Sequence, residues 1–185
     1  MKTVVSHSDL LAMLGDVERR DQGFALLMRH YGRALYWHIR RLMVNHDDAQ
    51  DALQETCIKV LEGIAGFKGD EEQLASWLYK IATREALQSL RRRTRLFQSI
   101  DDLGDSLVQQ LHAEASVDAD EATVLFQQAI LQLPTQQRLV FNMRYYDDLT
   151  HEQIAQVLGK NVGTVKTSYH YAVEKLRDYL KQHSS

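Results

Sequence analysis

The stretch from Asp148 to Leu176 constrains the fold most, because two helix starts and one helix stop lie within it. Thr150 is a preferred helix N-cap, and Gln153 follows at the spacing that completes a capping box. Gly159 then favours the left-handed conformation in which helices end. Asn161 is a good N-cap for a second helix. The pattern predicts two helices around a tight turn, a helix-turn-helix.

The second of these helices has one apolar face and one face that is small, hydrogen-bonding or basic. Its apolar residues step by four, three and four: Val165, Tyr169, Ala172 and Leu176. The residues left outside are Gly163, Thr164, Lys166, Thr167, Ser168, His170 and Tyr171. Such a face fits the major groove of DNA. The same pattern also fits a helical hairpin that only packs, so the rest of the chain has to decide.

Composition indicates a helical protein that is large and apolar enough to bury a hydrophobic core. The chain has 185 residues, 44% of them hydrophobic and 25% charged, with a single proline, which fits one or two small helical domains. No stretch approaches the roughly 20 apolar residues that span a bilayer, so we expect a cytoplasmic protein without membrane insertion. The single cysteine, Cys57, lies among apolar positions of a predicted helix and is expected to be a buried, inert thiol.

The net charge of −3 hides an uneven distribution. The segment from Asp101 to Ala122 holds seven acidic residues and no basic one. Without that segment the net charge becomes +4. The chain therefore reads as two mildly basic modules joined by an acidic connector, which is compatible with a nucleic-acid partner.

Apolar residues at helical spacing predict an all-α fold. The expected helices cover about 22–44, 47–64, 72–95, 121–133 and 134–146, followed by the helix-turn-helix. Asp47 is the expected N-cap of the second of these helices. The glycine-rich stretch Gly63–Gln73 predicts a loop that exposes Phe67 and Lys68. His38, on the apolar stripe of the first helix, is expected to be a core or boundary residue.

These patterns divide the chain into four parts. Residues 1–20 form a lead-in, 21–96 a first helical domain, 97–121 an acidic linker and 122–185 a second helical domain. The apolar groupings around Leu103 and Leu107–Leu111 are too sparse to hold a core, so this segment is expected to be a linker. An acidic linker cannot bind DNA, but it can occupy a basic nucleic-acid channel as a polyanion.

Three groups of residues, in order, resemble the sigma-70 family of bacterial RNA polymerase sigma factors, in the small extracytoplasmic-function type. They are Asp47-Asp48-Ala49-Gln50-Asp51 through Gln54-Glu55-Thr56, then Trp77-Leu78-Tyr79-Lys80-Ile81-Ala82 leading to Leu90-Arg91-Arg92, and Leu133-Pro134 through Val162-Gly163-Thr164-Val165-Lys166. The resemblance implies a sigma-2-like domain of three or four helices and a sigma-4-like helix-turn-helix domain. It also implies promoter recognition and opening together with core polymerase, for a stress or envelope-response regulon.

The resemblance assigns roles to residues that the pattern leaves exposed. Asp48, Asp51, Gln54 and Glu55 correspond to the face that docks on a coiled coil of the polymerase's largest subunit. Phe67, Lys68, Lys80, Arg84, Gln88, Arg91 and Arg92 correspond to the part that reads and melts the downstream promoter element. The outward residues from Gly163 to Tyr171 correspond to the reader of the upstream element. Relatives commonly carry arginines where this chain has Ser168, Tyr171 and Val173, so weaker upstream affinity in isolation is expected.

Other classes of protein fit less of the chain. No zinc-binding histidine follows His151-Glu152 at the required spacing, and no glycine-rich phosphate loop follows a strand, so neither an enzyme nor a metal or cofactor is expected. A stand-alone helix-turn-helix regulator remains the alternative, although it leaves residues 21–96 unexplained. The expected partners are core RNA polymerase and promoter DNA, and the resemblance admits an anti-sigma factor as a further partner.

Overall fold

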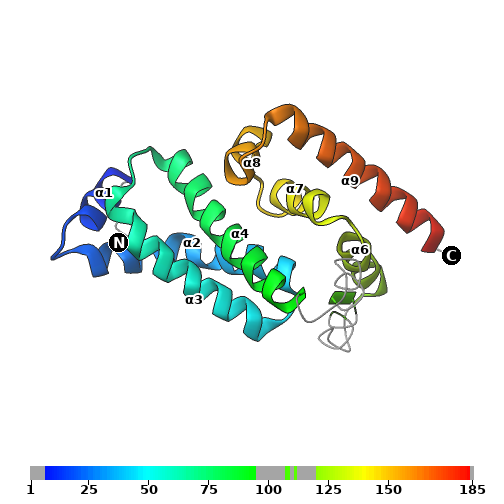
Figure 1. The fold of residues 1–185 in the computed structure, drawn as a ribbon, viewed down its shortest axis with the longest axis horizontal. Coiled ribbons are helices and arrows are strands. Elements are labelled where there is room, and N and C mark those ends of the chain that lie inside the picture. The colour runs from blue at the N-terminus through cyan, green and yellow to red at the C-terminus, as the bar shows by residue number, and fades with distance from the viewer. Residues whose placement is uncertain (1–6, 95–106, 109–110, 112–119, 184–185) are drawn as a thin grey trace.

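The structure is a computed structural model that describes residues 7–94, 107–108, 111 and 120–183, and these residues are almost entirely helical (Figure 1). The labelled elements are α1 (His7–Gly15), α2 (Arg20–Met43), α3 (His46–Gly63), the 3-10 turn η1 (Ile64–Gly66), α4 (Glu71–Thr94), α6 (Glu121–Leu131), α7 (Thr135–Tyr145), α8 (His151–Leu158) and α9 (Val162–His183). The described part of the chain contains no strand, which confirms the all-α prediction.

Helices α1 to α4 pack against one another around a leucine-rich core. Leu27, Leu35 and Leu42 from the predicted stripe of α2 are fully buried. The lead-in contributes α1, whose Leu10 and Leu14 join the same cluster. Burying each such side chain stabilises the fold by roughly 1.5–3 kcal/mol, so α1 is part of the packed structure.

The chain turns tightly between α2 and α3. Val44 has a φ of 63°, which is rare for a β-branched residue, and its backbone N–H donates to the Arg40 carbonyl. The N-cap of α3 is Asn45, whose side chain accepts from the Asp48 N–H at 3.0 Å. The prediction that Asp47 caps this helix is therefore wrong. Asp47 and Asp48 lie in the first turn instead, where the positive end of the helix dipole stabilises their carboxylates.

Helices α6 to α9 form the second group, and its local signals are confirmed. Thr150 and Gln153 make both hydrogen bonds of a capping box at the start of α8. Gly159 ends α8 in the left-handed conformation with a φ of 62°. Asn161 accepts from the Thr164 N–H at 2.7 Å and so begins α9. Helix α8 thus meets α9 through a three-residue turn, as the sequence predicts.

The two groups are in direct contact. Helix α8 packs beside α4, and α7 lies against α2, so the main hydrophobic cluster continues from the first group into the second (Figure 1). Leu107 is 1% exposed and belongs to that cluster. Leu107 therefore packs onto a core that other helices form. Most of the predicted acidic linker, 97–121, lies outside the described residues.

Candidate functional site

The outer face of α3 carries the acidic side chains that the sequence predicts there. Asp51, Gln54 and Glu55 are exposed and recur at three- and four-residue spacing, so they share one face of the helix. Asp48 is half-buried one turn earlier. The opposite face holds Ala49, Ala52 and Val60 in the core. The acidic side chains are therefore available to a partner without any change in packing.

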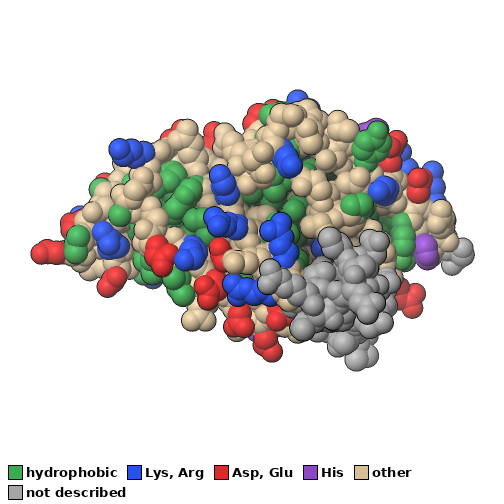
Figure 2. Space-filling model, in the orientation of Figure 1, with side chains coloured by type: hydrophobic (Ala, Val, Ile, Leu, Met, Phe, Trp, Pro, Cys, Tyr) green, Lys and Arg blue, Asp and Glu red, His purple; other side chains and the backbone are tan. Residues whose placement is uncertain are grey.

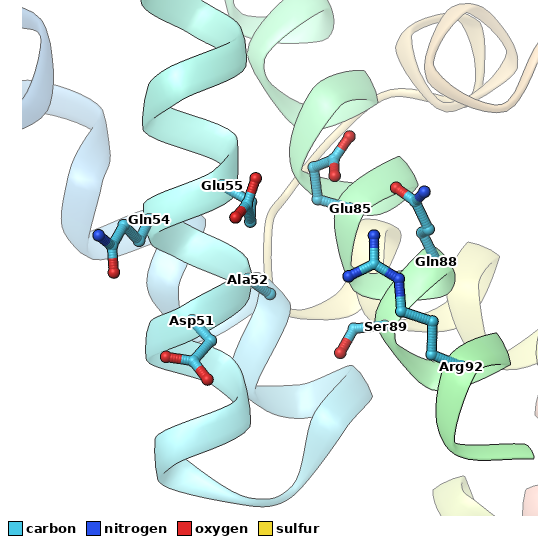
Figure 3. A pocket seen from close by; sticks show the side chains of 8 residues that line it. All are labelled: Asp51, Ala52, Gln54, Glu55, Glu85, Gln88, Ser89 and Arg92. Atoms are coloured by element: carbon cyan, nitrogen blue, oxygen red, sulfur yellow. The ribbon is translucent and has the colours of Figure 1, made fainter. Parts of the chain in front are cut away.

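This acidic face borders a shallow groove between α3 and α4, which Figure 3 shows from close by. Its lining residues are Asp51, Ala52, Gln54 and Glu55 from α3 and Glu85, Gln88, Ser89 and Arg92 from α4. Glu55 and Glu85 reach into the space from opposite helices, and the Arg92 guanidinium extends along its α4 side (Figure 3). The volume of about 280 Å³ fits a few side chains of a partner. The structure thus brings residues predicted for polymerase binding and for DNA binding into one groove.

Helix α4 presents a basic stripe to solvent. The exposed positions step along the helix by four, four, three and one residues, and they are Lys80, Arg84, Gln88, Arg91 and Arg92. In the space-filling view, Lys and Arg side chains follow α4 across the middle of the molecule (Figure 2). Such a row of cations can follow a phosphate backbone.

The loop before α4 is more closely packed than the sequence suggests. Lys68 is exposed, but Phe67 is half-buried with its ring centroid 5.3 Å from that of Trp77. The prediction that the loop exposes Phe67 is therefore wrong. A Cβ on Gly69 would lie 2.5 Å from Oε1 of Gln73 and 2.7 Å from the Phe67 ring, so a side chain at this position would displace both. Asp70 then caps α4 by accepting from the Gln73 N–H at 2.9 Å.

The two other aromatic residues near this loop lie inward. Trp77 is half-buried and packs against the core. Tyr79 is 6% exposed and contacts His38 edge-on, with ring centroids 5.1 Å apart. Burial raises the pKa of Tyr79 far above its ordinary value, and the Asp147 carboxylate raises it further. Tyr79 is thus a buried neutral phenol and cannot stack on a base in this arrangement.

The first turns of α9 are open to solvent, as the helix-turn-helix predicts. The predicted residues Gly163, Thr164, Lys166, Thr167, His170 and Tyr171 are exposed and Ser168 is half-exposed. Two of these side chains already have partners within the helix. The Thr164 hydroxyl donates to the Asn161 side chain at 2.9 Å, and His170 lies 3.4 Å from Glu174. Lys166, Thr167 and Ser168 lie beside them on the same open part of the helix.

Sequence reasoning missed Glu85 and Ser89, which line the groove beside Gln88 and Arg92. Their spacing of three and four residues places all four on the groove side of α4. That spacing was visible in the sequence, but only contact with α3 identifies which side of α4 forms a groove.

Other kinds of site find little support among the described residues. In that part of the chain, no group of three or more His, Cys, Asp or Glu side chains is arranged to hold a metal ion. None of the helices described is long and apolar enough to cross a membrane. Cys57 is half-buried with its Sγ 3.8 Å from the Met28 sulfur, and burial raises the pKa of its thiol, which disfavours the reactive thiolate.

A helical chain with a basic helix face in one part and an exposed helix-turn-helix in the other defines a class of DNA-binding protein. Comparison with protein families then identifies it further. Residues 27–96 match the family model described as Sigma-70 region 2, and residues 123–176 match Sigma-70, region 4. The chain belongs to the sigma-70 family of RNA polymerase sigma factors, in the extracytoplasmic-function type. It binds core polymerase and directs promoter recognition and opening, and members of this family are initiation factors rather than enzymes.

Individual relatives agree with this assignment. SigW of Bacillus subtilis is 30% identical over 175 residues, which cover 89% of this chain and 93% of SigW. SigE of Mycolicibacterium smegmatis is 30% identical over 166 residues, and the match spans 86% of this chain but 62% of the length of SigE. Among solved structures, the sigma factor RpoE from Bartonella quintana, in complex with the anti-sigma factor NepR, is similar with a TM-score of 0.67. It is 23% identical, with 85% of this chain and 96% of RpoE covered, and so shares the fold.

Proposed function

We propose that this sigma factor works through three separate surfaces, one for the polymerase and two for the promoter. The observation that carries the proposal is that all three lie open in one structure: the acidic face of α3, the basic stripe of α4 and the first turns of α9. Each surface is placed by a helix whose opposite side is in a core. Residues 21–96 then supply docking and melting, and residues 122–185 supply upstream recognition.

The acidic face of α3 docks on the polymerase. Asp51, Gln54 and Glu55 offer carboxylates and an amide in a row about one turn long, which fits a helix with basic residues. Exposed charges of this kind steer association and set the register of the two surfaces. The partner in this proposal is the coiled coil of the polymerase's largest subunit that the family resemblance implies.

The stripe along α4 holds the opened downstream promoter element. Lys80, Arg84, Arg91 and Arg92 would bind phosphates, and Gln88 has an amide that can read a base edge. Lys68, in the loop before α4, adds a further exposed cation. The Phe67 ring packs against Trp77 and the Tyr79 ring against His38. Binding of the DNA strand in this proposal therefore comes from charge more than from aromatic stacking.

The first turns of α9 read the upstream element in the major groove. Lys166 is the one Lys or Arg between Gly163 and Tyr171, so affinity for isolated DNA is low and tethering by the polymerase supplies the rest.

We further propose a cytoplasmic location and a stress or envelope-response regulon. An anti-sigma factor is a proposed regulator, because a structural relative was solved with one.

Charge reversal on α3 tests the docking surface. The double variant Asp51→Lys and Glu55→Lys should lower affinity for core polymerase roughly tenfold or more, since like charges facing each other across an interface cost several kcal/mol. Competition against a labelled sigma factor measures this affinity, and circular dichroism verifies the helical fold.

The matched control is the double variant Glu174→Lys and Asp178→Lys on α9. This pair has the same four-residue spacing, the same change in charge and comparable exposure. Core affinity should stay close to that of the wild type. Equal affinities for both double variants would remove α3 from the docking surface.

A further inference from the structure

Helix α2 carries a positive charge that the proposed function does not use. It contains five arginines and one aspartate, a net charge of +4. Helix α4, which is proposed to hold the promoter strand, has five Lys or Arg residues and three glutamates, a net charge of +2. One side of α2 packs against α1, α3 and α4. The charge on its other side therefore calls for an explanation of its own.

Three side chains on the outer side of α2 form a row, which we call the α2 row: Arg29, Arg33 and Trp37. They recur at every fourth residue, so neighbours lie about 6 Å apart along one face of the helix. Both arginines are exposed, and Trp37 is 47% exposed. The buried residues of the same helix, such as Leu27 and Leu35, lie on the opposite side. The α2 row can therefore meet a partner without any change in packing.

The two arginines of the α2 row have no acidic partner in the described part of the chain. No ion pair involves Arg29 or Arg33 there. The acidic residues of the neighbouring helix α3 lie toward α4 instead, where Asp51 and Glu55 line the groove. Two guanidinium groups on an open surface without a counter-ion attract an anionic partner.

Trp37 is held in place by its neighbours. Its ring meets that of Tyr36 edge-on, with centroids 5.4 Å apart. The Tyr36 hydroxyl is hydrogen-bonded to Nδ1 of His46 at 2.7 Å, which ties this end of α2 to the start of α3. A large aromatic side chain that is already held loses little conformational entropy on binding. Trp37 thus offers a fixed apolar surface beside two cations.

The combination of side chains in the α2 row fits a single nucleic-acid strand. Guanidinium groups bind phosphates, and an exposed indole stacks on an unpaired base. The spacing of about 6 Å along the helix is comparable with the distance between neighbouring phosphates of a strand. A duplex keeps its bases stacked inside, and an acidic protein segment offers the indole nothing to stack on. Because this protein directs promoter opening, single-stranded DNA is present in the complex that it forms.

We propose that the α2 row is a second binding site for single-stranded DNA, in which Arg29 and Arg33 bind neighbouring phosphates and Trp37 stacks on an unpaired base. This site goes beyond the proposed function, which places the opened strand on α4 and the loop before it. Opened DNA is then attached to the first group of helices at two places, and aromatic stacking, which Phe67 and Tyr79 do not offer, comes from α2.

The fluorescence of Trp37 tests the proposal directly in the free full-length chain. The chain has two tryptophans, so Trp77→Phe leaves Trp37 as the only indole. The protein is titrated at low salt with an oligothymidylate of about ten nucleotides, a length within the usual site sizes of single-strand binding proteins. We expect saturable quenching, because the indole stacks on a base. The difference between the wild type and Trp37→Phe gives the same signal with Trp77 in place.

Substitutions then separate the two kinds of contact. Arg29→Gln together with Arg33→Gln should lower the slope of log K against log salt by about 1.4, since each phosphate contact on a single strand contributes about 0.7. Trp37→Ala should weaken binding of the labelled oligonucleotide, measured by anisotropy, at least about fivefold. The matched control is Arg177→Gln together with Lys181→Gln on α9, another exposed pair of cations four residues apart. It should keep the quenching and the salt slope.

Absence of Trp37 quenching by the oligonucleotide at low salt would overturn the proposal, and so would equal salt slopes for the two double variants with wild-type helical spectra. Two further probes exclude other partners. Equal quenching by polyglutamate of matched charge would assign the α2 row to an acidic protein, and equal quenching by a duplex of the same length would show that no unpaired base is needed. Either result contradicts the proposal. Since polymerase is absent, all of these outcomes are independent of the docking surface on α3.

Discussion

Individual side chains on α9 differ in how free they are to read DNA. Thr164 and Thr167 are both exposed hydroxyl residues, but the Thr164 hydroxyl is bound to Asn161 at the helix start. Thr164 therefore stabilises the helix, and Thr167 is left to contact the groove. Lys166, between them, is exposed and is the only Lys or Arg from Gly163 to Tyr171. Upstream recognition in the proposal therefore depends on very few side chains.

Lys166→Ala should reduce discrimination at one position of the upstream element by roughly 1–3 kcal/mol, as expected for loss of a contact to a guanine edge. The measurement is transcription, or binding by the assembled polymerase, across a set of single-base promoter variants. A phosphate contact would instead weaken all variants alike and lower the salt slope by about one. Transcription from a matched promoter that ignores changes at Lys166, Thr167 and Ser168 would remove α9 from the upstream reader.

At the scale of an element, α8 is defined almost entirely by local signals. The capping box at Thr150 and Gln153 fixes its first residue, and Gly159 fixes its last. Its inner face then places Ile154, Ala155 and Val157 in the core beside α4. The angle at which α9 leaves the turn depends on the left-handed conformation of Gly159.

Gly159→Ala should lower the free energy of unfolding by about 1 kcal/mol, because a Cβ is strained at a φ of 62° even though the space around it is open. In thermal unfolding this corresponds to a fall of roughly 2–4 °C in Tm. Gly66→Ala is the control, since it also has open space but lacks a positive φ, and it should change Tm little. Equal effects of the two substitutions would show that the turn tolerates a side chain.

How far the sequence predicts this structure depends on whether a feature is local. The caps of α8 and α9 are set by residues within one turn of each cap. The predicted helix starts at Thr150 and Asn161 and the predicted helix end at Gly159 are confirmed. The exposed row from Lys80 to Arg92 follows from periodicity in the same way. The pairing of His38 with Asp147 spans 109 residues, and no local pattern indicates it.

Errors in the prediction have similar causes. Asn45 and Asp47 are both good N-caps, and only the tight turn at Val44 selects the first. Phe67 lies among glycines and charged residues, so its packing against Trp77 could not be read from its neighbours. Leu107 belongs to the main hydrophobic cluster, and no local pattern in its segment indicates that.

At the scale of the whole molecule, the distribution of charge sets how the protein meets DNA. The seven acids between Asp101 and Ala122 turn two mildly basic modules into a chain with a net charge of −3. Most of this segment lies outside the described residues, so its role rests on charge alone. A polyanion on the same chain competes with DNA for the basic surfaces and suppresses non-specific binding.

Replacing these seven acids by their amides should make the free protein bind DNA more tightly, since the net charge changes from −3 to +4. Fluorescence anisotropy with a random duplex, at two salt concentrations, measures the affinity. The difference from the wild type should shrink at high salt, because it is electrostatic. Unchanged DNA affinity together with unchanged release of early transcripts would make the segment a simple tether.

In the proposed function, this chain gives core polymerase its choice of promoter through α3, α4 and α9. The most direct measurement is run-off transcription from a pool of genomic fragments of the source organism, with the 5′ ends of the products mapped. Discrete 5′ ends should appear only when core polymerase and this protein are both present, and they should disappear with the double variant at Asp51 and Glu55. Identical 5′ ends with and without the protein would contradict it, as would protection of a specific DNA site by the protein alone with no effect on polymerase.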